Sequence, residues 1–130
     1  MTARSSASAQ LGRWAEEQAA AFLEGQGYRV VARNYRTRIA EADLVVTDGK
    51  TVVFVEVKGR RHRRFGTPWD AVDGRKRRRI VAAARAFLAQ HPRYRNMTVR
   101  FDAVALEPAP GGGRWRIQWL PDAFSPHDLY

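Results

Sequence analysis

The sequence predicts a single α/β domain built on a mixed central β-sheet with flanking helices. Short apolar runs rich in β-branched residues, at 42–47 and 51–58, have the length and composition of buried strands. Two longer stretches, 8–25 and 74–90, carry apolar residues at helical spacing. With further strands predicted at 28–35, 97–106 and 114–120, the order is helix, three strands, helix, two strands, which is typical of helices packed on a sheet.

The first predicted helix sets the N-terminal boundary of the domain. Ser8 can cap it, Gly25 and Gly27 can end it, and its apolar stripe is Leu11, Ala15, Ala19, Phe22 and Leu23. Residues 1–8 are small and polar and are predicted to form a mobile leader. We therefore expect a leader at 1–8, one domain at 9–120 and a C-terminal tail at 121–130.

The second predicted helix, 74–90, turns Ile80, Ala83, Ala84, Phe87 and Leu88 toward the sheet. Thr67 and Pro68 predict a short helical turn ahead of it. In the first strand, alternation places Val30 and Ala32 on one face and Val31 on the other.

Composition excludes several classes of protein. The 130 residues include no cysteine, so neither a disulfide framework nor a cysteine-based zinc site is available. No apolar stretch has membrane-spanning length, and the first residues lack the apolar core of a secretory signal. A cytoplasmic protein without a membrane partner is expected.

The positive charge is concentrated in one part of the chain. The formal net charge is +10, and residues 58–79 hold ten basic and two acidic residues, which leaves only +2 for the other 108. Solvated faces generally mix the two signs of charge, whereas a phosphate-backbone binder concentrates positive charge. This stretch therefore predicts a nucleic-acid partner.

Carboxylates gather at one end of the predicted hairpin. Asp48 and Gly49 form a turn between the strands at 42–47 and 51–58, so Asp43 and Glu56 lie toward the same end. Glu56 and Lys58 share a face of their strand, and taken alone they could form a simple salt bridge within it. Two neighbouring carboxylates repel each other unless a cation lies between them, and oxygen ligands suit Mg²⁺ or Mn²⁺. We therefore expect the two carboxylates to meet, with Lys58 on the same side.

Asp43 followed by Glu56-x-Lys58 resembles the motif of the PD-(D/E)xK nucleases, which have the restriction-endonuclease-like fold. The wider pattern resembles the small bacterial YraN-type family of proposed endonucleases. The residues that carry this resemblance span most of the chain: Gly12, Glu16, Ala19, Leu23, 27–28, 33–36, Glu41, 43–44, 53–58, Arg60, 65–66, 71–72, Lys76 and 100–102. Where the family pattern has Gly-Glu-Ile-Asp, this chain has Ala40, Glu41, Ala42 and Asp43, which keeps both acids but changes the local backbone requirement.

The resemblance implies a metal-dependent endonuclease that hydrolyses phosphodiester bonds in DNA, such as branched or single-strand-containing DNA. It implies catalytic roles for Asp43, Glu56 and Lys58, with Mg²⁺ or Mn²⁺ held by Asp43, Glu56 and the carbonyl of Val57. Accessory roles fall to Glu16 and Glu41, although a glutamate at a helix edge or on a rim often has no such role. Junction-cleaving members of the superfamily act as dimers, so a homodimer is a further expectation by analogy with them.

The basic residues would grip the nucleic-acid backbone without reading bases. Those expected to do so are Arg60, Arg61, Arg63 and Arg64 on the loop after the third strand, and Arg75, Lys76, Arg77, Arg78 and Arg79 at the start of the second long helix. Lys76 matches the family position of a phosphate clamp.

Two other classes of function stay open on the sequence alone. The same basic face could belong to a non-catalytic nucleic-acid-binding module whose acids pair with arginines and hold no metal. An interaction protein could instead use Trp115 and Trp119, although packing of such aromatic residues against a helix is more common.

Overall fold

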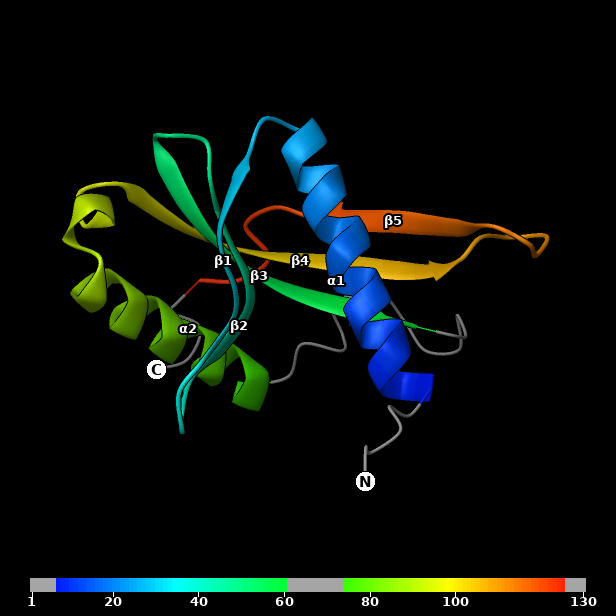
Figure 1. Cartoon of the computed structure of the whole chain (residues 1–130), viewed down its shortest axis with the longest axis horizontal. Helices are drawn as coiled ribbons and strands as arrows, with labels where there is room; N and C mark the ends of the chain where they lie inside the picture. Colours follow the sequence, from blue (N-terminus) through cyan, green and yellow to red (C-terminus); the bar gives the residue numbers. More distant parts are fainter. Residues whose placement is uncertain (1–6, 61–73, 126–130) are drawn as a thin grey trace, which may run out of the picture.

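A computed structural model describes residues 7–60 and 74–125 and contains a five-stranded sheet with two long helices (Figure 1). The elements are α1 (Ala7–Gly25), β1 (Arg29–Arg36), β2 (Glu41–Thr47), β3 (Thr51–Gly59), α2 (Gly74–Gln90), the 3₁₀ turn η2 (Pro92–Tyr94), β4 (Thr98–Pro108) and β5 (Trp115–Leu120). The predicted α/β class and the predicted order of elements are confirmed. This architecture is consistent with a restriction-endonuclease-like fold.

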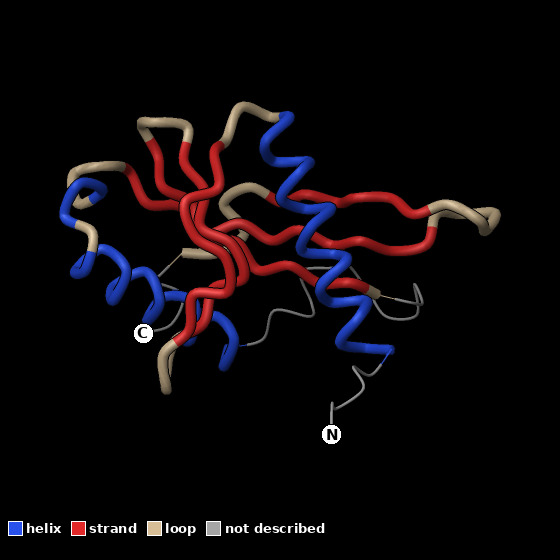
Figure 2. The backbone as a smooth tube through the Cα atoms, viewed as in Figure 1, coloured by secondary structure: helices blue, strands red, loops and turns tan. Residues whose placement is uncertain are grey.

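The sheet is mixed and follows chain order, β1-β2-β3-β4-β5. Pairing is antiparallel except between β3 and β4, which run parallel because α2 lies between them in the chain. In Figure 2 the strands β1 and β2 run steeply while β4 and β5 cross the view, so the sheet is strongly twisted. The strand β3 is central and pairs on both sides.

The two helices cover opposite faces of the sheet, and each face has its own apolar core. On the α1 face, Ala15, Ala19 and Leu23 pack with Val53, Val55 and Val57 of β3. On the α2 face, Ile80, Ala83 and Phe87 pack with Val52 and Phe54 of the same strand. The alternation of β3 therefore directs Glu56 and Lys58 to the α2 face.

The strand β1 departs from the predicted alternation. A β-bulge lies between Val30 and Ala32, so Val30 packs in the α1-side core while Val31 and Ala32 both pack in the α2-side core. The expectation that Val30 and Ala32 share a face was wrong because the bulge adds one residue to the strand.

A buried polar cluster stabilises the side of the sheet that is formed by β4 and β5. Asp102 is fully buried and accepts hydrogen bonds from Arg100 Nε (2.8 Å), Arg100 Nη2 (2.9 Å), the Trp119 indole N–H (2.9 Å) and the Asp122 backbone N–H (2.9 Å). The Trp119 ring also packs edge-on against Phe22 of α1. Trp119 is therefore a packing residue, as the commoner outcome for such aromatics predicts.

The helix α1 begins before the predicted domain limit at residue 9, and the core extends past the predicted limit at residue 120. The helix α1 begins at Ala7, so Ser8 lies inside the helix and not at its cap. Near the C-terminal end, Phe124 is buried and stacks on Phe101, and Ala123 donates its N–H to the Phe101 carbonyl at 2.7 Å. The turn predicted at Thr67 and Pro68 falls outside the described residues. Within the part of the chain that the structure describes, no helix is both long and apolar enough to cross a membrane.

Candidate active site

The β2–β3 hairpin fixes the register of the candidate site. At its turn, Asp48 Oδ1 accepts the backbone N–H groups of Lys50 (2.9 Å) and Thr51 (2.8 Å), and these bonds lower the pKa of Asp48. Gly49 has a φ of 95°, a left-handed conformation that glycine adopts without strain. The resulting register pairs Leu44 with Val55 as the last residues of the β2–β3 ladder.

Asp43 and Glu56 lie just beyond that last pair, where β2 and β3 separate. A side-chain hydrogen bond joins them. Asp43 is only 6% exposed, and its Oδ2 also accepts the backbone N–H of Val57 at 2.7 Å. The structure therefore brings the two carboxyl groups together, as expected from the hairpin.

The electrostatics of this pair are unusual for two acids. Burial, the neighbouring charge of Asp43 and their shared hydrogen bond together raise the pKa of Glu56 to about 8, while the charge of Lys76 opposes the shift. Burial also raises the pKa of Asp43, against the lowering effect of the Val57 N–H. With its pKa raised in this way, Glu56 favours its protonated form at neutral pH and shares a hydrogen bond with Asp43, because ionising both neighbouring carboxyl groups is costly.

Lys58 follows Glu56 by two residues on the same strand. Its side chain is exposed, whereas Val57 between them is buried in the α1-side core. Lys58 therefore projects from the same face as Glu56, at the solvent-facing end of β3.

Glu16 reaches the same region from α1. Its side chain accepts a hydrogen bond from the Asn34 side chain, and its pKa is raised by burial and by the charge of Asp43. Asn34 has a φ of 48°, a left-handed conformation that few residues other than glycine and asparagine tolerate. Sequence reasoning missed the contact between Asn34 and Glu16, for which the only signal was an asparagine near the end of a strand.

Glu41 lies beside the pair and is held by arginines from two elements. Its carboxylate forms ion pairs with Arg36 of β1 at 3.4 Å and with Arg79 of α2 at 3.5 Å. Its charge raises the pKa values of Asp43, Glu56 and Glu16, so all four acids lie within electrostatic range of one another. Glu41 therefore forms ion pairs with two arginines, whereas Asp43 and Glu56 share a hydrogen bond with each other.

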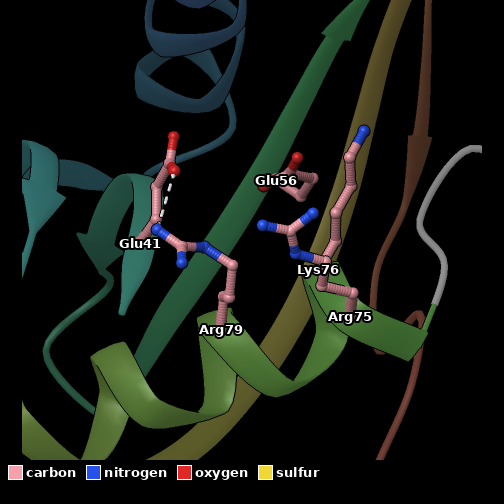
Figure 3. A pocket seen from close by; sticks show the side chains of 5 residues that line it. All are labelled: Glu41, Glu56, Arg75, Lys76 and Arg79. Carbon is pink, nitrogen blue, oxygen red and sulfur yellow. Dashed lines mark ion pairs between the residues drawn. The ribbon is translucent and has the colours of Figure 1, made fainter. Parts of the chain in front are cut away.

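A cavity of about 390 Å³ opens beside Glu56 on the α2 side (Figure 3). Its lining residues are Glu41, Glu56, Arg75, Lys76 and Arg79. In Figure 3 the three basic side chains rise from α2 toward the strands that carry the two glutamates. The cavity is therefore lined by two glutamates from the sheet and by three basic side chains from α2, which form its basic wall.

The remaining predicted backbone-binding residues lie elsewhere. Arg77 and Arg78 belong to the same turns of α2 but do not line this cavity, and the Arg77 guanidinium lies over the Phe124 ring at 5.5 Å. Arg60 is half-buried just after β3 and donates its backbone N–H to the Leu106 carbonyl at 2.8 Å. Arg61, Arg63 and Arg64 lie outside the described residues.

The described residues supply few protein ligands for a metal ion. Within 7–60 and 74–125, no group of three or more histidine or acidic side chains converges as an ion-binding cluster. What the chain offers is the Asp43–Glu56 pair and nearby main-chain carbonyls such as that of Val57. Such a set suits a cation that keeps most of its waters, as Mg²⁺ does.

The departure from the Gly-Glu-Ile-Asp pattern is accommodated locally. Ala40 and Ala42 are both buried in the α2-side core. Among the described residues other than glycine, only Asn34 and Asp122 have a positive φ, so the backbone at Ala40 does not require glycine.

Comparison with known proteins identifies relatives over most of the chain. Residues 15–106 match the model of a family described as uncharacterised protein family UPF0102. A UPF0102 protein of Pseudomonas putida (strain GB-1) is 49% identical over 113 residues, covering 87% of this chain and 91% of that protein. A UPF0102 protein of Pseudomonas aeruginosa (strain LESB58) is 44% identical, with 87% and 90% covered.

Proposed function

The chain belongs to the uncharacterised protein family UPF0102, and from the geometry of its site we propose that it is a metal-dependent endonuclease of the PD-(D/E)xK type. The reaction is hydrolysis of phosphodiester bonds in nucleic acid. DNA that is branched or contains single-stranded segments is the proposed substrate.

The observation that carries this proposal is the contact between Asp43 and Glu56. Asp43 is buried and Glu56 is partly buried, and the raised pKa of Glu56 means that the metal-free pair retains a proton at neutral pH. Pairing two acids in this way has a cost that a simple structural role would avoid. A divalent cation in place of the shared proton removes the cost and lets both groups ionise.

The proposed metal ligands are Asp43, Glu56 and the Val57 carbonyl, with Mg²⁺ or Mn²⁺ as the ion. Two carboxylates with water and a substrate phosphate completing the coordination is the usual way in which proteins bind Mg²⁺. When bound, such an ion polarises a phosphoryl oxygen and lowers the pKa of a coordinated water.

The side chains around the Asp43–Glu56 pair have different roles in the proposed reaction. Lys58 orients the attacking water and offsets negative charge that develops on the phosphoryl group. Arg75, Lys76 and Arg79 on the cavity wall attract the phosphate and hold it above Glu56. Glu41, already paired with Arg36 and Arg79, orients these arginines instead of binding the metal.

Activity with a panel of fluorescent DNA substrates in Mn²⁺ or Mg²⁺ tests the proposal. The panel should include single-stranded, flapped and four-way-junction DNA. Wild type should cut at least one of them, and Asp43→Ala, Glu56→Ala and Lys58→Ala should each lower the rate by at least about 10²-fold while binding persists. Glu16→Ala should cause a smaller loss.

Two controls make the result decisive. Equal cutting by wild type and Lys58→Ala would reveal a contaminating nuclease. Titration with Mn²⁺, monitored by calorimetry, should show binding to wild type and none to Asp43→Asn. Nucleic-acid binding without metal binding or cleavage would instead identify a non-catalytic binding module.

A further inference from the structure

A second and larger cavity lies against the first half of α1. Its volume is about 660 Å³, and its lining residues are Ala9, Gly12, Arg13, Glu16, Asn34 and Arg36. Among the described residues, it shares no lining residue with the α2-side cavity. Two interactions nevertheless relate this cavity to the site: Glu16 lies within electrostatic range of Asp43, and Arg36 forms an ion pair with Glu41, which lines the other cavity.

Gly12 is the most informative residue of this second cavity. It lies inside α1, where glycine destabilises a helix relative to alanine. Packing within the described chain does not require it, because, apart from its chain neighbours and the backbone of α1 itself, no described atom lies within 4 Å of the position that a Cβ would take. Gly59 provides the contrast, since a Cβ there would approach Leu11 Cγ at 3.0 Å and Ala15 Cβ at 3.1 Å.

A helical glycine that faces an open cavity exposes bare backbone to whatever occupies that cavity. The cations beside it indicate an anionic occupant: Arg13 is exposed, and the Arg36 side chain is 60% exposed despite its ion pair. Glu16 repels anions, but its charge is partly satisfied by the hydrogen bond that it accepts from the Asn34 side chain. Phosphate contacts therefore belong at Arg13 and Arg36.

We propose that this cavity binds the sugar–phosphate backbone of the substrate strand beyond the scissile phosphate, in close contact with α1 at Gly12. The strand then enters over the α2-side cavity, passes the Asp43–Glu56 pair and continues along α1. Because the two cavities lie on either side of the Asp43–Glu56 pair, one single strand of nucleic acid that passes this pair can contact both of them. The inference rests on the proposed nuclease function and adds to it where the substrate lies.

Gly12→Ala tests the inference because it should change stability and substrate binding in opposite directions. The added methyl group should raise the midpoint of thermal unfolding, since alanine is the better helix former. It should weaken binding of a fluorescein-labelled single-stranded DNA oligonucleotide, measured by anisotropy in EDTA. It should also slow cutting in Mn²⁺ by about 10- to 100-fold, because the strand is displaced from its reactive position.

Gly25→Ala is the matched control. Gly25 lies at the opposite end of α1, also with open space around its Cβ position among the described atoms. Because Gly25 is the last residue of the helix, this variant should change the midpoint of thermal unfolding little, and it should bind and cut like wild type. Equal losses in both variants would overturn the inference by attributing the effect to the helix in general.

Two further outcomes separate the inference from the function on which it depends. If wild type binds and cuts DNA and Gly12→Ala does so equally well, the strand does not pass along α1, and the nuclease proposal stands. If wild type neither binds nor cuts the oligonucleotide or the junction and flap substrates, both the function and the inference fail.

Discussion

At the scale of single residues, acids in this protein are held in two opposite ways. Asp102 is buried and accepts four hydrogen bonds, two of them from the Arg100 guanidinium, so its charge is compensated. Asp43 and Glu56 are buried mainly against each other, and their pKa values are raised. The first arrangement stabilises the fold, whereas the second leaves a place for a cation.

The Asp43–Glu56 pair predicts a stability that falls as pH rises. In the unfolded chain Glu56 releases its proton near its ordinary value of 4.5, but in the metal-free fold it does so only near 8. Between these values the folded state binds more protons than the unfolded state, so raising the pH favours unfolding, by on the order of a few kcal/mol at most. Urea denaturation of wild type and Glu56→Gln between pH 5 and 8.5 measures this difference.

Glu56→Gln should remove most of that pH dependence, because glutamine cannot ionise. Saturating Mn²⁺ should stabilise wild type more strongly at pH 8.5 than at pH 5, since the ion replaces the retained proton. Parallel pH profiles for wild type and Glu56→Gln would contradict the assignment of the proton to this pair.

Asp102→Asn should destabilise the fold without altering the site. An amide in place of the carboxylate leaves Arg100 uncompensated and turns an N–H donor toward groups that already donate, at a cost of about 2–4 kcal/mol. Chemical denaturation measures the loss, with the exposed Glu17→Gln as a control. A loss below about 1 kcal/mol would show that the cluster relaxes around the change.

At the scale of elements, α2 presents its positive charge in two directions. Arg75, Lys76 and Arg79 line the cavity beside Glu56, whereas Arg77 lies over Phe124 and Arg78 does not face the cavity. The helix begins with a run of cations, which its dipole disfavours. This cost is offset if the cavity-facing cations bind phosphate.

Two double variants of equal charge test this division of α2. Arg75→Gln with Lys76→Gln should weaken DNA binding and flatten its dependence on salt, because fewer counterions are released on binding. Arg77→Gln with Arg78→Gln should have a clearly smaller effect. Anisotropy titrations at several salt concentrations compare the two variants. Equal slopes of affinity against salt would show that the contribution of a cation does not depend on whether it faces the cavity.

The same element scale shows what the sequence could predict. The bounds of α2 and the hairpin at Asp48 and Gly49 follow from apolar spacing and turn residues, because both signals are local. The bulge in β1 left no local signal, so the faces of Val31 and Ala32 were not predictable from alternation. The meeting of Asp43 and Glu56 was predictable from the hairpin, but the contact of Asn34 with Glu16 depends on how α1 packs over the sheet.

At the scale of the whole molecule, the candidate site is formed by residues from the sheet and from both long helices. The sheet supplies Asp43 and Glu56, α1 supplies Glu16, and α2 supplies the basic wall (Figures 1 and 3). One cavity lies on the α2 side and the other lies along α1. The fold thus places two binding surfaces on either side of one pair of carboxyl groups.

The position of β1 at the edge of the sheet has a consequence for self-association. Edge strands offer unpaired backbone groups to any identical chain, and charged side chains are a common protection against such joining. Within its eight residues β1 has exposed arginines at 29, 33 and 36 and no acidic residue. Two copies approaching through this edge would repel each other, so the strand next to the candidate site is protected against edge-to-edge aggregation.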